Sequence, residues 1–166
     1  MGPLTLSAPV LLDSEHELDD FSCGVASLDD WLKRRARSNQ ISGASRTYVV
    51  AEKRRVVGYY CLASGALAPI DAPGPIRRNI PDPIPIAVLG RLAVDRSYQH
   101  KGLGVALLQD AVTRAAQAGR ILGIRRLLVH AISEEAKTFY EHFGFVASPT
   151  RPMTLILALP AHTAAR

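Results

Sequence analysis

The chain is poor in cysteine: Cys23 and Cys61 are the two thiols in 166 residues, with no CxxC pair and no metal-ligand spacing. We therefore expect reduced thiols, no disulfide framework and no bound metal. Apolar runs are short, and none approaches the roughly 18 residues that a membrane-spanning helix needs. The first 20 residues also lack a basic region ahead of an apolar core, the pattern of a secretory signal. These absences predict a cytoplasmic protein that does not bind a membrane.

Compositional bias is also lacking. The 11 prolines and 12 glycines are near average usage, and 48% hydrophobic with 21% charged residues is typical of a globular protein. A chain of this length buries roughly 70% of its unfolded surface, so it needs no staple to stay folded. The length predicts one domain over residues 1–166.

Charge is unevenly distributed along a chain whose formal net charge is +5. Residues 13–30 hold seven Asp or Glu and no Lys or Arg, whereas residues 31–55 hold eight basic residues and one acid, Glu52. This asymmetry fits a polyanionic partner, and it also fits a solvated helix face. The charge pattern alone leaves both interpretations open.

Hydrophobic periodicity predicts a mixed α/β chain. Ser27 is a candidate N-cap for a helix over 27–41, and "RTYVVAE" with "VVGYYCLASGAL" predicts an antiparallel hairpin before a proline-rich loop over 68–83. The nearly all-apolar "IPIAVLGRLAVD" predicts a central strand that splays from its neighbour at Gly90. The remaining predicted elements are a helix over 104–118 ended by Gly119, a strand over 124–131, a helix from about Ser133, and closing strands in "GFVAS" and "MTLILAL". One strand–helix–strand crossover spans residues 85–130.

A glycine pair stands where that central strand gives way to the helix, in Gln99-His100-Lys101-Gly102-Leu103-Gly104. A P-loop is excluded because no Lys-Ser or Lys-Thr follows the glycine, and a dinucleotide fingerprint because Leu107 replaces the third small residue. Glycines let an anion approach backbone N–H groups at a helix N-terminus, where the helix dipole favours negative charge. A tight strand-to-helix turn explains the same glycines, so the motif by itself fits either role.

The order and spacing of "LGRLAVD", "QHKGLG", "RLLVHA" and "EEAKTFYEHFGF" resemble the GNAT acetyltransferase superfamily over residues 85–147. The resemblance implies a mixed, mostly antiparallel sheet of about six or seven strands with a central splayed pair, flanked by helices. It also implies acetyl-CoA as the co-substrate. The pyrophosphate would bind Gln99, His100, Lys101, Gly102, Leu103, Gly104 and the N–H of Val105, and the pantetheine arm would pair with Leu92, Ala93 and Val94.

Tyr140 lies in "FYEHFGF", and core statistics alone favour a packing role over catalysis for a tyrosine beside Phe139 and Phe143. The resemblance instead implies that Tyr140 protonates the departing CoA thiolate. Because a phenol has a pKa near 10 and a thiol near 8.5, that transfer costs only about 2 kcal/mol. No carboxylate stands where it would serve as a base, and Asp95 is expected to cap the loop. A missing base favours an α-amine substrate, already largely neutral near pH 8, or a water relay.

Two further stretches narrow the resemblance. "FSCGVASLDDWLKRRA" is similar to the F-x-C-G-x-x-x-L-(D/N)-x-(F/W)-L opening of acetyltransferase toxins from bacterial toxin–antitoxin pairs, and "PIPIAVLGRLAVDRSYQHKGLGVALLQDA" and "GIRRLLVHAISEEAKTFYEHFGF" are similar to the same group. The match covers roughly residues 17–159. It implies acetylation of the α-amine of aminoacyl-tRNA, a block of translation, a homodimer, and neutralisation by a ribbon-helix-helix antitoxin that also binds operator DNA.

A tRNA substrate requires basic residues that contact phosphates. The candidates are Lys33, Arg34, Arg37, Arg77, Arg78 and Arg91. Arg91 interrupts an apolar strand, so it either contacts the phosphate or acceptor end or forms a structural salt bridge. Two alternatives to a toxin stay open: a stand-alone acetyltransferase for a small-molecule or protein amine, and a non-catalytic CoA-binding regulatory module.

Overall fold

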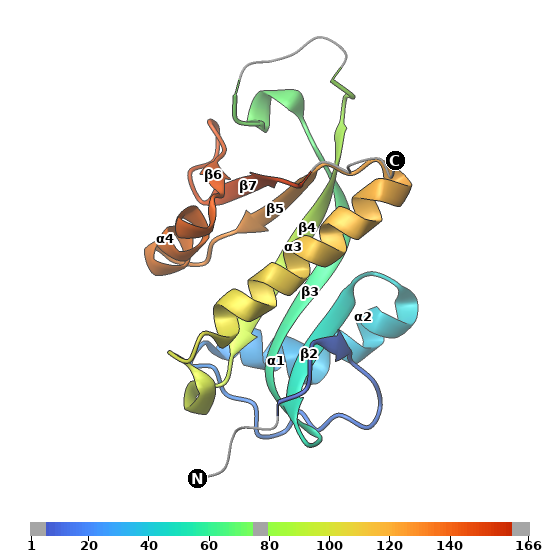
Figure 1. Ribbon diagram of the computed structural model, residues 1–166, viewed down its shortest axis with the longest axis vertical. Helices are drawn as coiled ribbons and strands as arrows, with labels where there is room; N and C mark the ends of the chain where they lie inside the picture. The colour runs from blue at the N-terminus through green and yellow to red at the C-terminus, as the bar shows by residue number, and fades with distance from the viewer. Residues whose placement is uncertain (1–5, 75–79, 161–166) are drawn as a thin grey trace, which may run out of the picture. The chain divides into compact units, whose positions relative to one another are not determined.

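The chain divides into two compact units, and the computed structural model describes residues 6–74 and 80–160. The first unit runs up to Ala63 and includes Gly90–Ala111; the second comprises Ser64–Leu89 and continues from Val112. In the described residues, seven strands form one sheet in the order β1-β2-β3-β4-β5-β7-β6 (Figure 1). The predicted α/β class and strand number are confirmed.

The first unit holds two short helices where the sequence predicted one. Helix α1 covers Ala26–Arg34 and α2 covers Ala36–Ser42, with a break at Arg35, whose φ of −120° departs from the helical value. Ser27 is not the N-cap as predicted; Val25 is, and it offers no side-chain hydrogen bond. The acid in the first turn, Asp29, instead accepts a hydrogen bond of 2.8 Å from the N–H of Cys23. The predicted cap was wrong because a carboxylate inside the helix satisfies the preceding backbone.

The predicted hairpin is confirmed. Strand β2 (Arg46–Glu52) pairs antiparallel with β3 (Arg55–Leu67) from Arg46 opposite Leu62 to Glu52 opposite Arg55, with a bulge between Val50 and Ala51. The short β1 (Val10–Leu11) pairs antiparallel with the outer side of β2. A core of the first unit lies against these strands and α1, and it includes the fully buried Phe21, Leu32 and Tyr59.

Strand β4 (Ile84–Val94) is the central strand predicted, and its pairing with β5 (Arg126–His130) is parallel. The pairs extend from Ala87 opposite Leu127 to Leu89 opposite Val129, whereas β4 continues through Gly90–Val94. A Cβ on Gly90 would lie 2.8 Å from the sulfur of Cys61, so glycine permits this close approach. The strand pair therefore ends next to Gly90, as the predicted splay requires.

Helix α3 (Leu103–Leu122) is longer than predicted. The predicted end at Gly119 was wrong, since the helix continues to Leu122. The glycine has another role: a Cβ on residue 119 would lie 2.1 Å from the carbonyl oxygen of Ile124, so only glycine permits this close approach. The left-handed residue that follows the last turn is Gly123, with φ +76°. Although α3 has 20 residues, no helix of the described ranges is long and apolar enough to span a membrane.

The second unit contains the closing elements. Helix α4 (Glu134–Phe143) is capped by Ser133, whose hydroxyl accepts the N–H of Ala136, and it ends at the left-handed Gly144. Strand β7 (Thr154–Ala158) lies between β5 and β6 (Val146–Ala147) and is antiparallel to both, as Figure 1 shows. The core of this unit includes Ile86, Leu128 and Ile156. The mostly antiparallel pairing agrees with the predicted fold.

Candidate active site

The glycine loop of the first unit follows the end of β4 and enters α3. A short 3-10 turn, η2 (Arg96–Tyr98), precedes it, and two loop residues adopt left-handed backbone: His100 at φ +63° and Gly102 at φ +84°. A Cβ on Gly102 would meet no atom within 4 Å, so this side of the loop is open. The N–H of Ala106 donates to the carbonyl of Gly102 at 3.1 Å. The N–H groups of residues 103–105 precede that first helical bond and have no acceptor inside the helix, as an anion site requires.

Gln99 fixes the loop through its side chain. Its amide nitrogen donates to the carbonyl of Val94 at 2.9 Å and to the carbonyl of Cys23 at 2.8 Å. These two bonds hold the loop to the end of β4 and to the segment ahead of α1. The side chain of Gln99 is thus committed to the protein, and any contact with a phosphate from this residue would come from its backbone.

Asp95 caps the loop, as predicted. The carboxylate is 2% exposed and accepts the N–H of Ser97 and the N–H of Ser22, each at 3.0 Å. A guanidinium nitrogen of Arg55 lies 3.5 Å away and supplies the opposite charge. A carboxylate with these partners is a structural group, which agrees with the absence of an evident base. No local sequence pattern indicates this role for Arg55, because its partner lies 40 residues away.

Lys101 and its neighbour Tyr98 define the outer side of the loop. The ammonium of Lys101 lies 5.6 Å from the centre of the Tyr98 ring and 3.3 Å from the carbonyl of Ser97. The Tyr98 hydroxyl donates to the carboxylate of Glu52, and this hydrogen bond, with burial, raises the pKa of Tyr98. Lys101 and His100 are exposed, so both can face a bound anion.

The predicted pantetheine strand is the last stretch of β4. Ala93 is buried, while Leu92 and Val94 are half-buried and share one face of the strand. The N–H of Asp95, just beyond, donates to the carbonyl of Val57 at 2.8 Å. The role of Leu92, Ala93 and Val94 in holding the pantetheine arm stays a prediction.

Tyr140 belongs to the second unit and is 6% exposed on α4. Its ring meets Phe139 edge-on at 5.2 Å and Phe145 at 5.4 Å between centroids. Phe143 packs against Phe145 in turn, at 6.5 Å between centroids. Substitution by Phe would keep these ring contacts and remove only the hydroxyl, which makes the predicted acid role testable.

The basic residues predicted to bind tRNA differ in what they contact. Lys33 and Arg34 are exposed on α1. Arg37 donates to the carbonyls of Asp13, at 3.4 Å, and His16, so its guanidinium holds the acidic N-terminal segment. Arg77 and Arg78 lie outside the described residues.

Within the first unit, Arg91 contacts an aromatic ring instead of forming the predicted salt bridge, and its predicted contact with a phosphate or acceptor end stays a prediction. Its guanidinium carbon lies 4.6 Å from the centre of the Trp31 ring, a cation–π contact, and Trp31 in turn stacks on Tyr59 at 5.9 Å. No salt bridge of Arg91 is found among the described residues. An aromatic partner on α1 explains how an arginine is accommodated in an apolar strand, and a half-buried guanidinium still presents an edge to a ligand.

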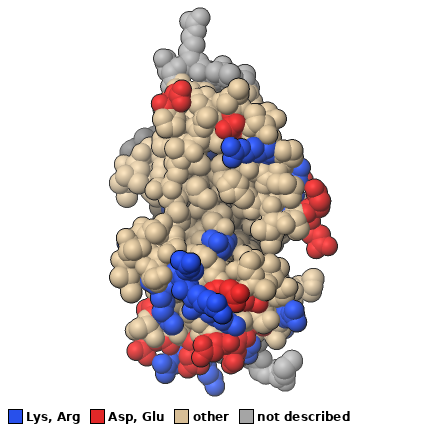
Figure 2. Space-filling view, turned by 180° about the vertical axis from the view of Figure 1, so that it is seen from behind, with Lys and Arg blue, Asp and Glu red and all other residues tan. Residues whose placement is uncertain are grey.

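The acidic segment ahead of α1 is partly neutralised. Arg54 lies 3.1 Å from the carboxylate of Glu15 and 3.8 Å from that of Glu17. On the face drawn in Figure 2, basic and acidic side chains lie side by side, with no large patch of one sign. Arg54 therefore offsets part of the acidic segment, while Lys33 and Arg34 remain exposed.

Neither cysteine is suited to nucleophilic chemistry. Burial and a hydrogen bond with Asp29 raise the pKa of Cys23 to about 11, and burial raises the pKa of Cys61. Both thiols therefore stay protonated at neutral pH. The described residues also contain no cluster of His, Cys, Asp and Glu that could hold a metal ion.

An open glycine loop before a helix, fixed to the end of the central strand, is the arrangement that the acetyltransferase resemblance implies for binding acyl-CoA. The Acetyltransferase (GNAT) domain family matches residues 43–147, and the chain belongs to this family. It is 50% identical over 153 residues, 92% of each chain, to the "tRNA-acetylating toxin" of Mycobacterium tuberculosis (strain ATCC 25618 / H37Rv).

Two solved structures are also similar to the chain. The first is AtaT complexed with acetyl-methionyl-tRNAfMet, at 30% identity and a TM-score of 0.85, covering 92% of this chain and 94% of that one. The second is a tyrosine-to-phenylalanine mutant of the AtaT toxin bound to the C-terminus of the antitoxin AtaR and acetyl-CoA, at 29% identity and a TM-score of 0.80, covering 93% of both chains. The predicted GNAT membership is confirmed.

Proposed function

We propose that this protein is an acetyl-CoA-dependent toxin that acetylates the α-amine of the amino acid on charged tRNA and thereby blocks translation. The observation that carries the proposal is the 50% identity to a tRNA-acetylating toxin over 92% of both chains. The similarity to AtaT bound to an acetylated aminoacyl-tRNA supports the same substrate class. The reaction would then take place in the cytoplasm, where charged tRNA is found.

The open loop supports the co-substrate assignment. The N–H groups of residues 103–105, the left-handed Gly102 and the exposed Lys101 together suit the pyrophosphate of acetyl-CoA. The co-substrate supplies an activated acetyl thioester. In this proposal residues 99–105 bind the diphosphate and Leu92, Ala93 and Val94 pair with the pantetheine arm, which would bring the thioester to the end of β4.

Tyr140 is the proposed general acid. The substrate amine attacks the acetyl carbon, the carbon–sulfur bond breaks, and the sulfur takes the proton of the Tyr140 hydroxyl while water removes the proton of the amine. A substrate α-amine with a pKa of about 7.7–8.0 is partly neutral at physiological pH, whereas a lysine amine near 10.4 is not. The structural commitment of Asp95 leaves the described part of the loop without a base, which supports an α-amine substrate.

The proposal extends to the partners that this toxin class implies. A ribbon-helix-helix antitoxin would neutralise the enzyme and connect it to operator DNA, and the likeness to AtaT bound to the antitoxin AtaR supports this. A homodimer is part of the same proposal. Among the described residues, the predicted RNA contacts with an accessible side chain include Lys33, Arg34 and Arg91, while the Arg37 guanidinium already holds backbone carbonyls.

The test is transfer of labelled acetyl from acetyl-CoA to a pool of charged tRNA. We expect labelled N-acetyl-aminoacyl-tRNA from the wild type and a 10²- to 10⁴-fold slower reaction, roughly the contribution of a general acid, from Tyr140→Phe. Tyr48→Phe is the matched control, since it removes a phenol hydroxyl elsewhere. An enzyme that acetylates free amines or proteins but no charged tRNA would refute the substrate. Full activity of Tyr140→Phe would refute the acid, and binding of acetyl-CoA without any transfer would indicate a regulatory module.

A further inference from the structure

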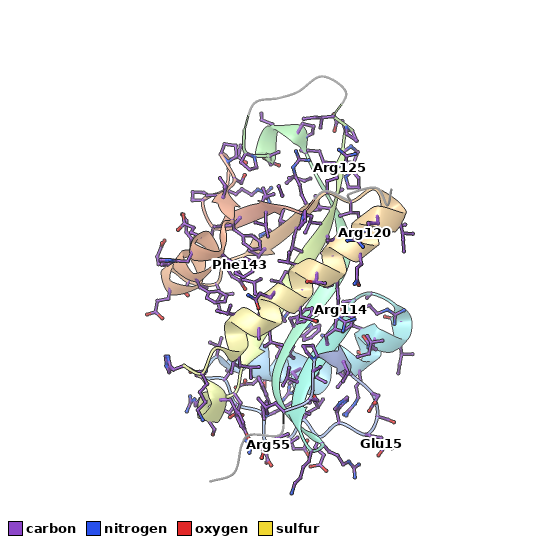
Figure 3. All side chains as sticks on the ribbon, viewed as in Figure 1. Glu15, Arg55, Arg114, Arg120, Arg125 and Phe143 are labelled. Atoms are coloured by element: carbon purple, nitrogen blue, oxygen red, sulfur yellow. The ribbon has the colours of Figure 1, made fainter. Side chains whose placement is uncertain are left out.

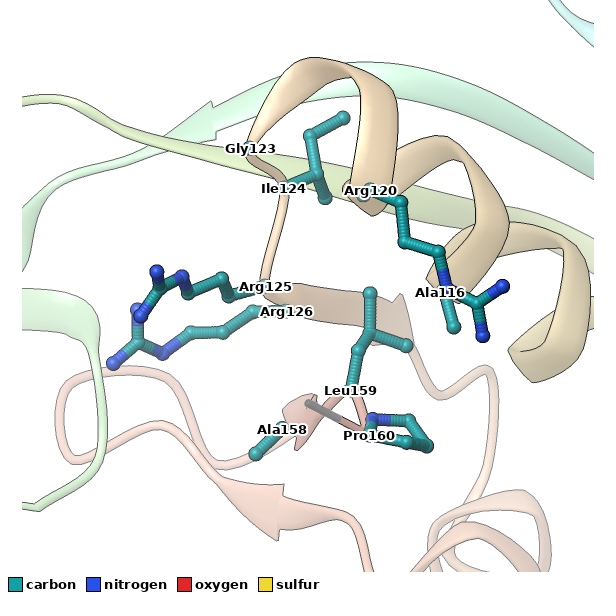
Figure 4. A pocket seen from close by; sticks show the side chains of 10 residues that line it. Ala116, Arg120, Gly123, Ile124, Arg125, Arg126, Ala158, Leu159 and Pro160 are labelled. Carbon is teal, nitrogen blue, oxygen red and sulfur yellow. The ribbon is translucent and has the colours of Figure 1, made fainter. Parts of the chain in front are cut away.

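A pocket of about 560 Å³ lies within the second unit, and among the described residues none of the predicted site residues or RNA contacts lines it. The end of α3, the start of β5 and the residues after β7 form its walls (Figure 4). Three of its lining residues are arginines: Arg120, Arg125 and Arg126. Figure 3 places Arg120 and Arg125 where α3 ends and β5 begins. This pocket is named the arginine pocket below.

The arginine pocket carries positive charge without compensation. No Asp or Glu of the described part of the chain lines it, and the sequence from residue 111 to residue 133 contains none. Among the described residues, none of the three guanidinium groups forms a salt bridge. Arg120 and Arg125 are exposed, and Arg126 is half-buried. The second unit therefore differs from the first, where Arg54 and Arg55 are paired with carboxylates.

The backbone that carries these side chains is held firmly. The N–H of Leu159 donates to the carbonyl of Arg125 at 2.8 Å, and Arg126 pairs with Ala158 across the β5–β7 ladder. Figure 4 shows Arg125 and Arg126 extended in the same direction, with Arg120 pointing away from them along the end of α3. Two adjacent guanidinium groups repel each other unless an anion lies between them, so this arrangement favours an oxyanion ligand.

The helix dipole explains only part of this cluster. Arg120 lies in the last turn of α3, where a cation is favoured by the partial negative charge of the helix C-terminus. Arg125 lies between the turn at Gly123 and β5, and Arg126 is the first residue of β5, so the dipole of α3 gives no reason for either. A ligand with several negative charges accounts for all three.

We infer that the arginine pocket binds the phosphodiester backbone of RNA, as a second contact for the tRNA substrate. This inference rests on the proposed function. Guanidinium groups that point in opposite directions match phosphates repeated along a strand better than a single carboxylate, because each can contact a different phosphate. The small apolar lining, which includes Ala116, Gly123 and Pro160, leaves room for a ribose. Contacts of this kind fix the position of the tRNA and carry no sequence preference.

The test measures binding of fluorescently labelled, deacylated tRNA over a series of salt concentrations. The variant is Arg125→Gln/Arg126→Gln, and the control is Lys53→Gln/Arg151→Gln, which removes the same charge from exposed residues elsewhere. We expect the variant to bind about tenfold more weakly or worse, and the slope of log affinity against log salt to fall by about 1.4–1.8 for two lost phosphate contacts. The slope of the control should differ from the wild-type slope by less than the change of about 0.7–0.9 that corresponds to one phosphate contact. If the double variant does not fold, Arg120→Gln replaces it, because that side chain is exposed. This variant removes one charge, so we expect half the change in the salt slope.

The outcomes separate this inference from the proposed function. In the acetylation assay we expect the double variant to raise KM for charged tRNA with kcat unchanged. Equal tRNA affinity and equal slope in variant and control would overturn the inference even if acetylation proceeds normally. If the wild type acetylates no charged tRNA but the double variant binds RNA more weakly than the wild type does, the proposed function is overturned and the RNA contact is supported. Binding of free AMP that the variant abolishes, with tRNA affinity unchanged, would assign the pocket to a free nucleotide and overturn RNA as its occupant.

Discussion

Gly102 and Gly43 form a matched pair that tests the phosphate loop. Both have left-handed backbone, at φ +84° and φ +80°, and a Cβ on either would meet no atom within 4 Å. Alanine at either position therefore introduces backbone strain without a steric clash. Left-handed backbone costs a non-glycine residue roughly 1–2 kcal/mol, so we expect Gly102→Ala and Gly43→Ala to lower the free energy of unfolding by about that amount each.

Function should separate the two variants. Gly43 ends α2, whereas Gly102 stands just before the N–H groups of residues 103–105. A methyl group on Gly102 occupies the open side of the loop, where the diphosphate is proposed to lie. We expect KM for acetyl-CoA to rise about tenfold or more in Gly102→Ala, the loss of roughly one charged hydrogen bond, and to stay at the wild-type value in Gly43→Ala.

Urea unfolding and steady-state kinetics measure the two effects on the same preparations. Because the strain is common to both variants, any difference in KM reports the loop rather than global stability. If both variants bind acetyl-CoA as the wild type does, the amides before α3 do not hold the diphosphate. If both lose affinity equally, the effect comes from stability and the reasoning about an open loop fails.

Three further predictions concern stability and thiol chemistry. Asp95→Asn should lower the free energy of unfolding by about 2–3 kcal/mol in urea, because a charged acceptor of two buried backbone N–H groups is lost, while the exposed Asp20→Asn changes it by less than about 0.5 kcal/mol. Gly119→Ala should abolish cooperative thermal unfolding or lower the free energy by roughly 3 kcal/mol or more, since its Cβ would lie 2.1 Å from the carbonyl oxygen of Ile124; a wild-type Tm would contradict that contact. The rate of alkylation of Cys23 should increase up to a pH of about 11, and a rate that levels off near pH 8.5 would refute the raised pKa. Because folding raises the pKa of this thiol, the contribution of Cys23 to stability should decrease between about pH 9 and 11.

Local patterns in the sequence were sufficient to predict most of the fold. The alternation in residues 46–67 predicted the hairpin, and the apolar run of residues 84–94 predicted the central strand, because side-chain periodicity reflects local geometry. The helix ends were predicted less well. Gly119 is a residue type that often ends a helix, yet the close approach of the Ile124 carbonyl explains better why glycine occupies this position. Gly123, which does follow the helix, is also a glycine, and the sequence around it marks a helix end no more strongly than the sequence around Gly119 does.

The site was predictable where it depends on backbone and less so where it depends on partners distant in sequence. The open glycine loop followed from its residues, and Asp95 was expected to cap it. That Gln99 binds the carbonyl of Cys23, or that Trp31 covers Arg91, depends on how α1 packs against the strands. No local pattern encodes such contacts. The arginine pocket was missed for the same reason, because its side chains come from the two ends of a turn.

The hydrogen bonds from Ser22 to Asp95 and from Gln99 to Cys23 join the segment before α1 to the loop that is proposed to receive the diphosphate. By thermodynamic linkage, whatever displaces residues 22–23 from outside weakens co-substrate binding, and a bound co-substrate resists that displacement by the same free energy. If the diphosphate binds this loop as proposed, a protein bound at residues 22–23 would change the affinity for the co-substrate without touching it.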